Sequence, residues 1–289
     1  MRTPELVTVI VPVLNAEPWL ADQLEALAGQ TYDGPWEMLV VDNGCTDRSI
    51  EIANAFEDRL PDLRVVQALD RRSLNRARNV GARAARGDFL AFCDADDVVT
   101  PNWLDALVEA SGRADIVGGT FDIYALNPPL YHAWRPDEPL TELPTDHDFL
   151  PYVNGGNCGV WTELARELGW DEVFDHGSSE TEFCWRAQMR NHTLAFVPDA
   201  VIKLRYRRSI RALARQYYSY GRSAPPLYMR FRHLGMPRDN KTAIWWWRWL
   251  ASNVGYLTES RERRGNWIRI AAFRAGRIGG SIKARTVFL

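Results

Sequence analysis

Several features that mark other classes of protein are missing from this 289-residue sequence. It has only four cysteines, without the short paired spacings of disulfide or metal motifs, and its start lacks the order of a signal peptide. No apolar run reaches the roughly 18 residues that cross a bilayer. No G-x-G-x-x-G opens a helix, which argues against a dehydrogenase. We therefore expect a globular cytoplasmic protein, at most peripheral on the inner face of the cell membrane.

Acidic residues are scarce in the last part of the chain. Residues 205–289 hold 19 Lys and Arg against 3 Asp and Glu, whereas the first 204 residues hold 16 against 34. This asymmetry predicts an acidic domain over 1–208, followed by a basic, aromatic and helical region over 209–289.

Short apolar runs alternate with helical spacings through the first hundred residues. Strands are predicted at 6–15, which should stop at Pro12, and at 37–41, 63–68 and 89–93, with helices over 19–29, 49–56 and 73–86 between them. Such alternation indicates a parallel sheet with its ligand crevice at the carboxyl ends of the strands. A further strand is expected at 116–124 and helices at 162–168 and from 178. The segment 127–151 shows no clear element and is interpreted as a loop or as an acceptor-side flap.

Acidic residues follow two of these strands. Asp94, Asp96 and Asp97 come directly after 89–93, and Asp42 follows 37–41. Carboxylates this close repel one another unless a hard cation or several donors offset their charge, so a divalent metal carrying phosphate is indicated. An acidic turn can also simply cap the next helix.

Two later stretches complete the candidate site. Gly155 and Gly156 would let the backbone approach a ligand closely. Ser178 or Ser179 with Glu182 fits a capping box, which leaves Glu180 without a structural role.

Together these segments resemble an inverting family-2 glycosyltransferase of the GT-A fold, over about residues 6–210. The resemblance is carried by Val11-Pro12-Val13-Leu14-Asn15, by the turn from Asp42 to Asp47 with Cys45 in the place of Ser, by Ala77-Arg78-Asn79 and Gly87-Asp88, by Asp94-Ala95-Asp96 as the DXD motif, and by Ser179-Glu180 ahead of Phe183 and Arg186. It implies an α/β fold: a GT-A, Rossmann-like, mixed but mostly parallel sheet flanked by helices, with a helical basic C-terminal appendage. It also implies that 1–208 is the catalytic domain, with a nucleotide-binding half over 1–100 and an acceptor half over 101–208.

The resemblance also implies roles for individual residues. On the donor side, Asp42 would accept from the nucleobase, Pro12 and Asn15 would line the nucleoside pocket, Arg76 or Arg78 would contact base or diphosphate, Asp94 with Ala95 would hold the ribose or donor sugar, and Asp96 would ligate Mn²⁺ or Mg²⁺. On the acceptor side, Gly155, Gly156, Asn157 and Ser179 would border the sugar. The donor would be a nucleotide sugar, with UDP favoured by family habit.

The implied chemistry is one displacement with inversion, in which Glu180 is the general base. Ser179-Glu180 replaces the family's Glu-Asp, so Glu182 is the alternative base. The family's occasional His after the base is missing, and Arg205 or Arg207 of a basic run either meets the diphosphate or is solvated.

Two other functions compete. A catalytically silent nucleotide-sugar-binding subunit would keep the donor pocket and lose the base. A nucleotidyltransferase is disfavoured, because it would want a Gly-rich basic loop after the first strand.

Tryptophan and arginine are mixed throughout 209–289, above all in 243–250 and 267–270. This composition is typical of helices that lie on an anionic membrane surface, which would favour a lipid-linked or cell-envelope glycan acceptor. The alternatives are packing against the acidic domain or a homo-oligomer interface. No nucleic-acid motif is present, so no nucleic acid partner is expected.

Overall fold

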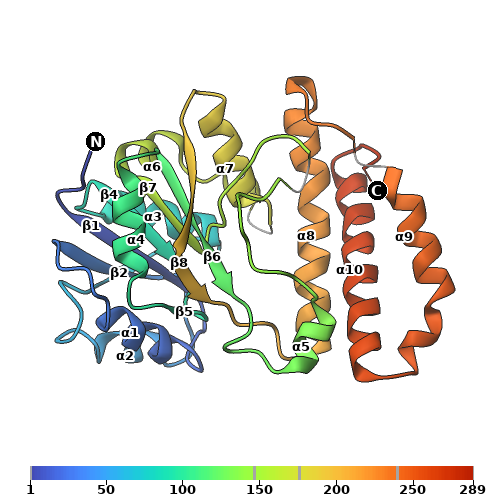
Figure 1. Cartoon of the computed structure of the whole chain (residues 1–289), viewed down its shortest axis with the longest axis horizontal. Helices are drawn as coiled ribbons and strands as arrows, with labels where there is room; N and C mark the ends of the chain where they lie inside the picture. Colours follow the sequence, from blue (N-terminus) through green and yellow to red (C-terminus); the bar gives the residue numbers. More distant parts are fainter. Residues whose placement is uncertain (1, 146–147, 175–176, 239–240, 289) are drawn as a thin grey trace.

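One mixed sheet organises the molecule, and three long helices stand side by side at its end (Figure 1). The computed structural model describes residues 2–145, 148–174, 177–238 and 241–288. The parts of the predicted loop 127–151 and tail 209–289 that fall on the other residues lie outside this description.

The sheet has eight strands in the order β3-β2-β1-β4-β7-β6-β8-β5. The strands β1 (Val7–Val13), β2 (Trp36–Asp42), β3 (Arg64–Gln67) and β4 (Phe89–Cys93) run parallel. The strand β7 (Asn157–Trp161) is antiparallel to β4 and to β6 (Ile116–Asp122). The strand β8 (Leu194–Lys203) is parallel to β6, and β5 (Val98–Val99) is antiparallel to β8.

Helices cover both faces of this sheet, which is why its central strands read as continuous apolar runs. Val9 and Val11 pack toward the face covered by α1 (Leu20–Ala28) and α4 (Trp103–Ser111). Ile10 packs toward the opposite face. This part of the chain also contains α2 (Ser49–Asn54), α3 (Leu74–Ala84), α6 (Thr162–Leu168), α7 (Ser179–Gln188) and the 3-10 turn η1 (Glu172–Phe174).

Three expectations about local structure were wrong. The first strand does not stop at Pro12, because its pairing with β4 ends at Ile10 and the missing N–H therefore removes no bond to β4. The segment 127–151 contains a short helix, α5 (Pro129–Trp134), which starts with a proline as helices often do. The capping box, predicted for Ser178 or Ser179 with Glu182, does not form. Ser178 has a left-handed φ of 57° and its hydroxyl bonds Ser223, while the Ser179 hydroxyl donates to Asn75 Oδ1.

The C-terminal region consists of α8 (Ile210–Phe231), α9 (Lys241–Ser252) and α10 (Arg261–Lys283), with 3-10 turns η2 (Arg232–Leu234) and η3 (Val254–Leu257). Glycines let α8 and α10 touch backbone to backbone: a Cβ on Gly221 would lie 2.0 Å from the Phe273 carbonyl oxygen. The indole of Trp134 on α5 donates to the Arg261 carbonyl at 2.8 Å, which joins α10 to the sheet domain. Among the described residues, no helix is long and apolar enough to span a bilayer.

Candidate active site

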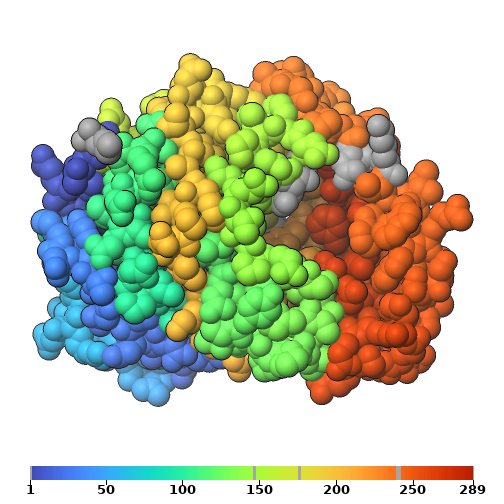
Figure 2. All heavy atoms as spheres, in the orientation of Figure 1, coloured from blue at the N-terminus to red at the C-terminus, as the bar shows by residue number. Residues whose placement is uncertain are grey.

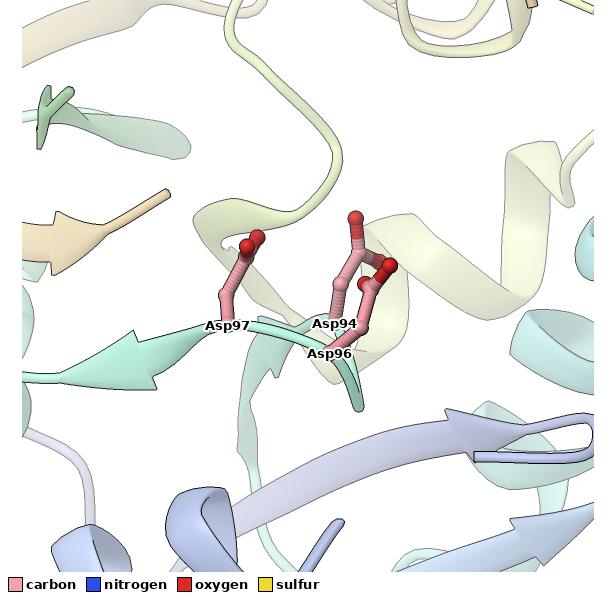
Figure 3. Close-up of side chains that lie close together, drawn as sticks. All are labelled: Asp94, Asp96 and Asp97. Atoms are coloured by element: carbon pink, nitrogen blue, oxygen red, sulfur yellow. The ribbon is translucent and has the colours of Figure 1, made fainter. Parts of the chain in front are cut away.

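Three carboxylates gather where β4 ends. Asp94, Asp96 and Asp97 each place a carboxylate oxygen within 4.8 Å of the others, and the first two side chains turn toward one another while the third stands to one side (Figure 3). Arg207 reaches the outer carboxylate, with Nη1 2.5 Å from Asp96 Oδ2. The backbone N–H of Arg205 donates to Asp97 Oδ1 at 2.7 Å.

The environment of these carboxylates opposes their ionisation. Burial raises the pKa of Asp94 to about 6; Arg78 works against this shift, and Asp96 and Glu180 add to it by repulsion. Burial, together with Asp96 and Asp94, also raises the pKa of Asp97 well above its ordinary value. Two unit charges about 5 Å apart at an effective dielectric constant near 20 repel by about 3 kcal/mol. A cation would relieve this repulsion, and an all-oxygen donor set suits a hard divalent ion, so these residues fit Mn²⁺ or Mg²⁺.

Glycines before β7 let this cluster pack closely. A Cβ on Gly156 would lie 2.4 Å from Asp94 Oδ2, and one on Gly155 would lie 2.7 Å from the Arg78 guanidinium. Arg78 is buried and donates to Ser179 Oγ at 3.3 Å. The structure therefore brings together five predicted residues from four separate places in the sequence.

Two cavities meet at Glu180. The first, of about 560 Å³, reaches the acid cluster at Asp94 and is lined by Leu74, Asn75, Arg78, Asp94, Asn154, Gly156, Gly177, Ser179, Glu180, Arg207, Ala212, Arg215, Gln216, Ser219 and Tyr220. The second, of about 510 Å³, is lined by Arg135, Tyr152, Asn154, Gly177, Ser178, Glu180, Thr181, Tyr217, Tyr220, Ser223, Ala224, Phe273 and Arg277. Figure 2 shows the surface hollowed between the green segment before β7 and the red of α10. Four residues are common to both linings: Asn154, Gly177, Glu180 and Tyr220.

Other predicted residues stabilise the turns beside β1 and β2. Asp42 Oδ1 accepts from the backbone N–H groups of Gly44 at 3.0 Å and Cys45 at 2.8 Å. Asn15, exposed and with φ of 52°, accepts from the Thr46 N–H at 2.8 Å. These contacts order the end of the sheet where a nucleoside is expected, although neither side chain lines the two cavities.

Several residues predicted to bind the donor or the acceptor are instead buried in the fold. The Asn157 amide donates to the carbonyl oxygens of Thr120 and Ala200, and its oxygen accepts from Trp103, so all of its polar atoms are engaged. Pro12 and Ala95 are buried, and the latter packs in the core.

Two arginines are held by acidic groups or carbonyls of the fold. Arg76 pairs with Asp70 at 2.6 Å and lines neither cavity. Arg205 donates to the Asp96 carbonyl at 2.9 Å, pairs with Asp22 and stacks over Trp19. Both guanidinium groups are therefore engaged by the fold.

The alternative base, Glu182, is fully buried. Its Oε1 accepts from Arg186 Nε at 2.7 Å and from Arg230 Nη1. Glu182 lines neither cavity, whereas Glu180 lines both.

Sequence reasoning missed the contribution of α8, which supplies Ala212, Arg215, Gln216, Ser219 and Tyr220 to the first cavity. No local signal marks these residues, because their role depends on how the helix folds back onto the sheet domain.

Comparison with known proteins agrees with this geometry. The family model for glycosyl transferase family 2 matches residues 8–169. The chain belongs to this family. It is 33% identical over 181 residues to glycosyltransferase GlyG of Streptococcus pneumoniae, a match covering 62% of the chain and 52% of that relative. It is 37% identical over 118 residues to the uncharacterized glycosyltransferase EpsJ of Bacillus subtilis, covering 40% of the chain and 34% of the relative. The chain thus aligns with about half of the first relative and a third of the second.

Solved structures show the same fold at low identity. A mannosyltransferase, PcManGT from Pyrobaculum calidifontis in complex with GDP-Man and Mn²⁺, matches with a TM-score of 0.62 at 20% identity, covering 98% of this chain and 88% of that one. S. aureus TarS in complex with UDP-GlcNAc matches with a TM-score of 0.54 at 16% identity, covering 97% and 92%. These similarities confirm the GT-A fold predicted from the sequence.

Proposed function

We propose that this protein is a metal-dependent inverting glycosyltransferase that moves a sugar from a nucleotide sugar, with UDP favoured, to a hydroxyl acceptor. The observation that carries this proposal is the position of Glu180, which lines both the cavity that reaches Asp94 of the acid cluster and a second cavity that none of the three acids lines. A general base for direct transfer must face both the donor sugar and the incoming hydroxyl, and a carboxylate that lines both cavities is suited to that role. The fold neighbours that bind UDP-GlcNAc or GDP-Man support a nucleotide-sugar donor.

Asp96, with Asp94 beside it, would hold the divalent ion. When bound, that ion would offset the charge that develops on the leaving diphosphate. Arg207 already lies against Asp96 and can add a second positive charge there. Arg78, fixed between Ser179 and Gly155, orients its charge toward Asp94.

In the transfer step, the oxygen of the acceptor hydroxyl bonds to the anomeric carbon while Glu180 accepts the proton of that hydroxyl. The bond from that carbon to the diphosphate oxygen breaks, and the leaving nucleoside diphosphate takes the electron pair. Because the step uses one base and no protein nucleophile, the anomeric configuration inverts, unlike in a double displacement.

Replacing Glu180 with Gln tests this role against that of a silent nucleotide-sugar-binding subunit. Turnover should fall by roughly 10² to 10⁴, the usual worth of general base catalysis, while donor affinity stays unchanged. A wild-type protein that binds donor but neither transfers nor hydrolyses its sugar would instead be the silent subunit.

Metal dependence is tested by the change in melting temperature on adding UDP, GDP or dTDP with and without Mn²⁺ or Mg²⁺, because a ligand of the native state stabilises it by mass action. Asp96→Ala should remove the metal-dependent part of the stabilisation. Unchanged nucleotide affinity in calorimetry would contradict the assignment of this residue.

The base-binding role of Asp42 has its own test. Asp42→Asn should weaken the binding of uridine nucleotides more than that of adenosine nucleotides, because the hydrogen bond that this carboxylate would accept is expected from the uracil ring. Equal losses would mean that this carboxylate serves only its turn to Gly44 and Cys45.

We further propose that the C-terminal helices lie on an anionic membrane surface and that the acceptor is a lipid-linked or cell-envelope glycan. On α9, Ile244 is 71% exposed and Trp245 56% exposed, with Trp247 and Arg248 also facing out. Aromatic rings with neighbouring cations suit the headgroup region. Such an enzyme would meet its acceptors in the plane of the membrane.

Co-sedimentation with vesicles tests this surface. The protein should pellet with anionic vesicles at low salt and less with neutral ones, and Ile244→Ser with Trp245→Ser should weaken pelleting. A wild type that stays in the supernatant contradicts the proposal, and self-association lost in the double variant would favour a homo-oligomer interface.

A further inference from the structure

We infer that α8 is part of the active site: the second cavity holds a sugar ring of the acceptor, and the Tyr220 hydroxyl presents the reacting acceptor hydroxyl to Glu180. This inference rests on the proposed transferase function and adds the acceptor's location, its class and a residue that binds it.

Tyr220 stands where an acceptor-binding group is needed, since it lines both cavities together with Glu180. Gln216, one turn earlier on α8, donates its amide N–H to the phenol oxygen at 2.9 Å. Because that oxygen is accepting, the phenol proton is left to donate toward the cavity.

The protonation state of this group fits a donor. Burial of its phenol raises the pKa of Tyr220 to about 12; the positive charge of Arg135 opposes this shift, and the negative charge of Glu180 adds to it. The phenol therefore stays neutral at physiological pH and does not compete with the carboxylate for the acceptor proton.

The second cavity has the chemistry of a sugar site. Four aromatic rings line it, from Tyr152, Tyr217, Tyr220 and Phe273, and they can pack against the C–H faces of a sugar. Asn154, Ser178, Thr181 and Ser223 add amide and hydroxyl groups for its hydroxyls. Its volume of about 510 Å³ lies within the range of about 300–1,000 Å³ for small-molecule sites.

The start of α7 is tied to α8, so the base and the acceptor site are positioned together. The Ser178 and Ser223 hydroxyls are 2.8 Å apart and hydrogen-bonded, two residues before Glu180. Behind this contact α8 is held against α10 by the close approach at Gly221. Groups carried on such rigidly packed helices can hold the geometry that transfer requires.

Tyr220→Phe removes the hydroxyl and keeps the ring, and Tyr218→Phe is the matched control. Tyr218 is on the same helix, is equally exposed at 40%, and lines neither cavity. The probes are p-nitrophenyl hexosides, whose binding is followed by saturation-transfer NMR with UDP and Mn²⁺ present. UDP binding in the same samples, measured by calorimetry, reports separately on the proposed function.

We expect at least one hexoside to bind the wild type and Tyr218→Phe equally and to bind Tyr220→Phe about five- to tenfold more weakly, as for the loss of one hydrogen bond. UDP affinity should be the same in all three proteins. Equal hexoside binding by Tyr220→Phe would overturn the role of the hydroxyl, and binding of no hexoside while UDP binds would overturn the sugar site. Failure of UDP to bind would instead count against the proposed function.

Discussion

Replacing Glu182 with Gln should destabilise the fold while leaving the chemistry intact, the reverse of the result expected for Glu180→Gln. Glu182 is completely buried and its Oε1 accepts from two guanidinium groups, those of Arg186 and Arg230. Breaking a buried pair by removing one charge typically costs about 3–5 kcal/mol. The two arginine side chains keep 20% and 38% of their surface exposed, so water can partly solvate them. Because a Gln oxygen can still accept, we expect a loss of about 2–3 kcal/mol.

For a chain of this size that loss corresponds to a melting temperature roughly 4–12 °C lower. Thermal unfolding and turnover of both variants, measured at a temperature where each is folded, separate the two carboxylates. Glu180→Gln should melt like the wild type and lose turnover, and Glu182→Gln should melt early and turn over normally. Lost turnover in a fully folded Glu182→Gln with an active Glu180→Gln would refute the assignment of the base.

Two further predictions follow from the packing of the sheet. Gly156→Ala should weaken nucleotide binding by about tenfold or more, because its Cβ would lie 2.4 Å from Asp94 Oδ2, whereas Gly29→Ala, with its nearest atoms 3.7 Å away, is the control that should bind normally in calorimetry. Burial raises the pKa of Glu37, but hydrogen bonds led by the Arg86 N–H lower it overall below 4.5. Its carboxylate therefore stabilises the fold above about pH 4.5 and loses this effect as the pH falls through the lowered value. The stability gap between wild type and Glu37→Gln, measured by urea unfolding, should shrink over that acidic range, and a gap that widens there would contradict the assigned sign.

The first half of the sheet could be predicted because each of its strands is a short apolar run followed by a turn. The strand β8 could not, because Pro198 and Asp199 interrupt its apolar pattern. The structure shows why the interruption is tolerated: Gly119 pairs with Val197 but the next residue, Thr120, pairs with Val201, so the residues between them lie outside the ladder. A local pattern cannot indicate that two separated pieces belong to one strand.

The candidate site, too, has one part that follows from residues close in sequence and one that depends on contacts between distant segments. The acid cluster could be predicted because Asp94, Asp96 and Asp97 are adjacent in sequence, so their proximity needs no tertiary argument. The role of α8 could not, because the helical period of 210–231 gives its apolar face but not its partner. Two contacts fix the position of α8: Gly221 packs against α10, and Ser223 is hydrogen-bonded to Ser178 at the start of α7. A change at either contact would therefore shift α8 against the start of α7, and with it the wall of the second cavity relative to Glu180. Consequently, the C-terminal helices cannot be regarded as a simple attachment to a finished catalytic domain.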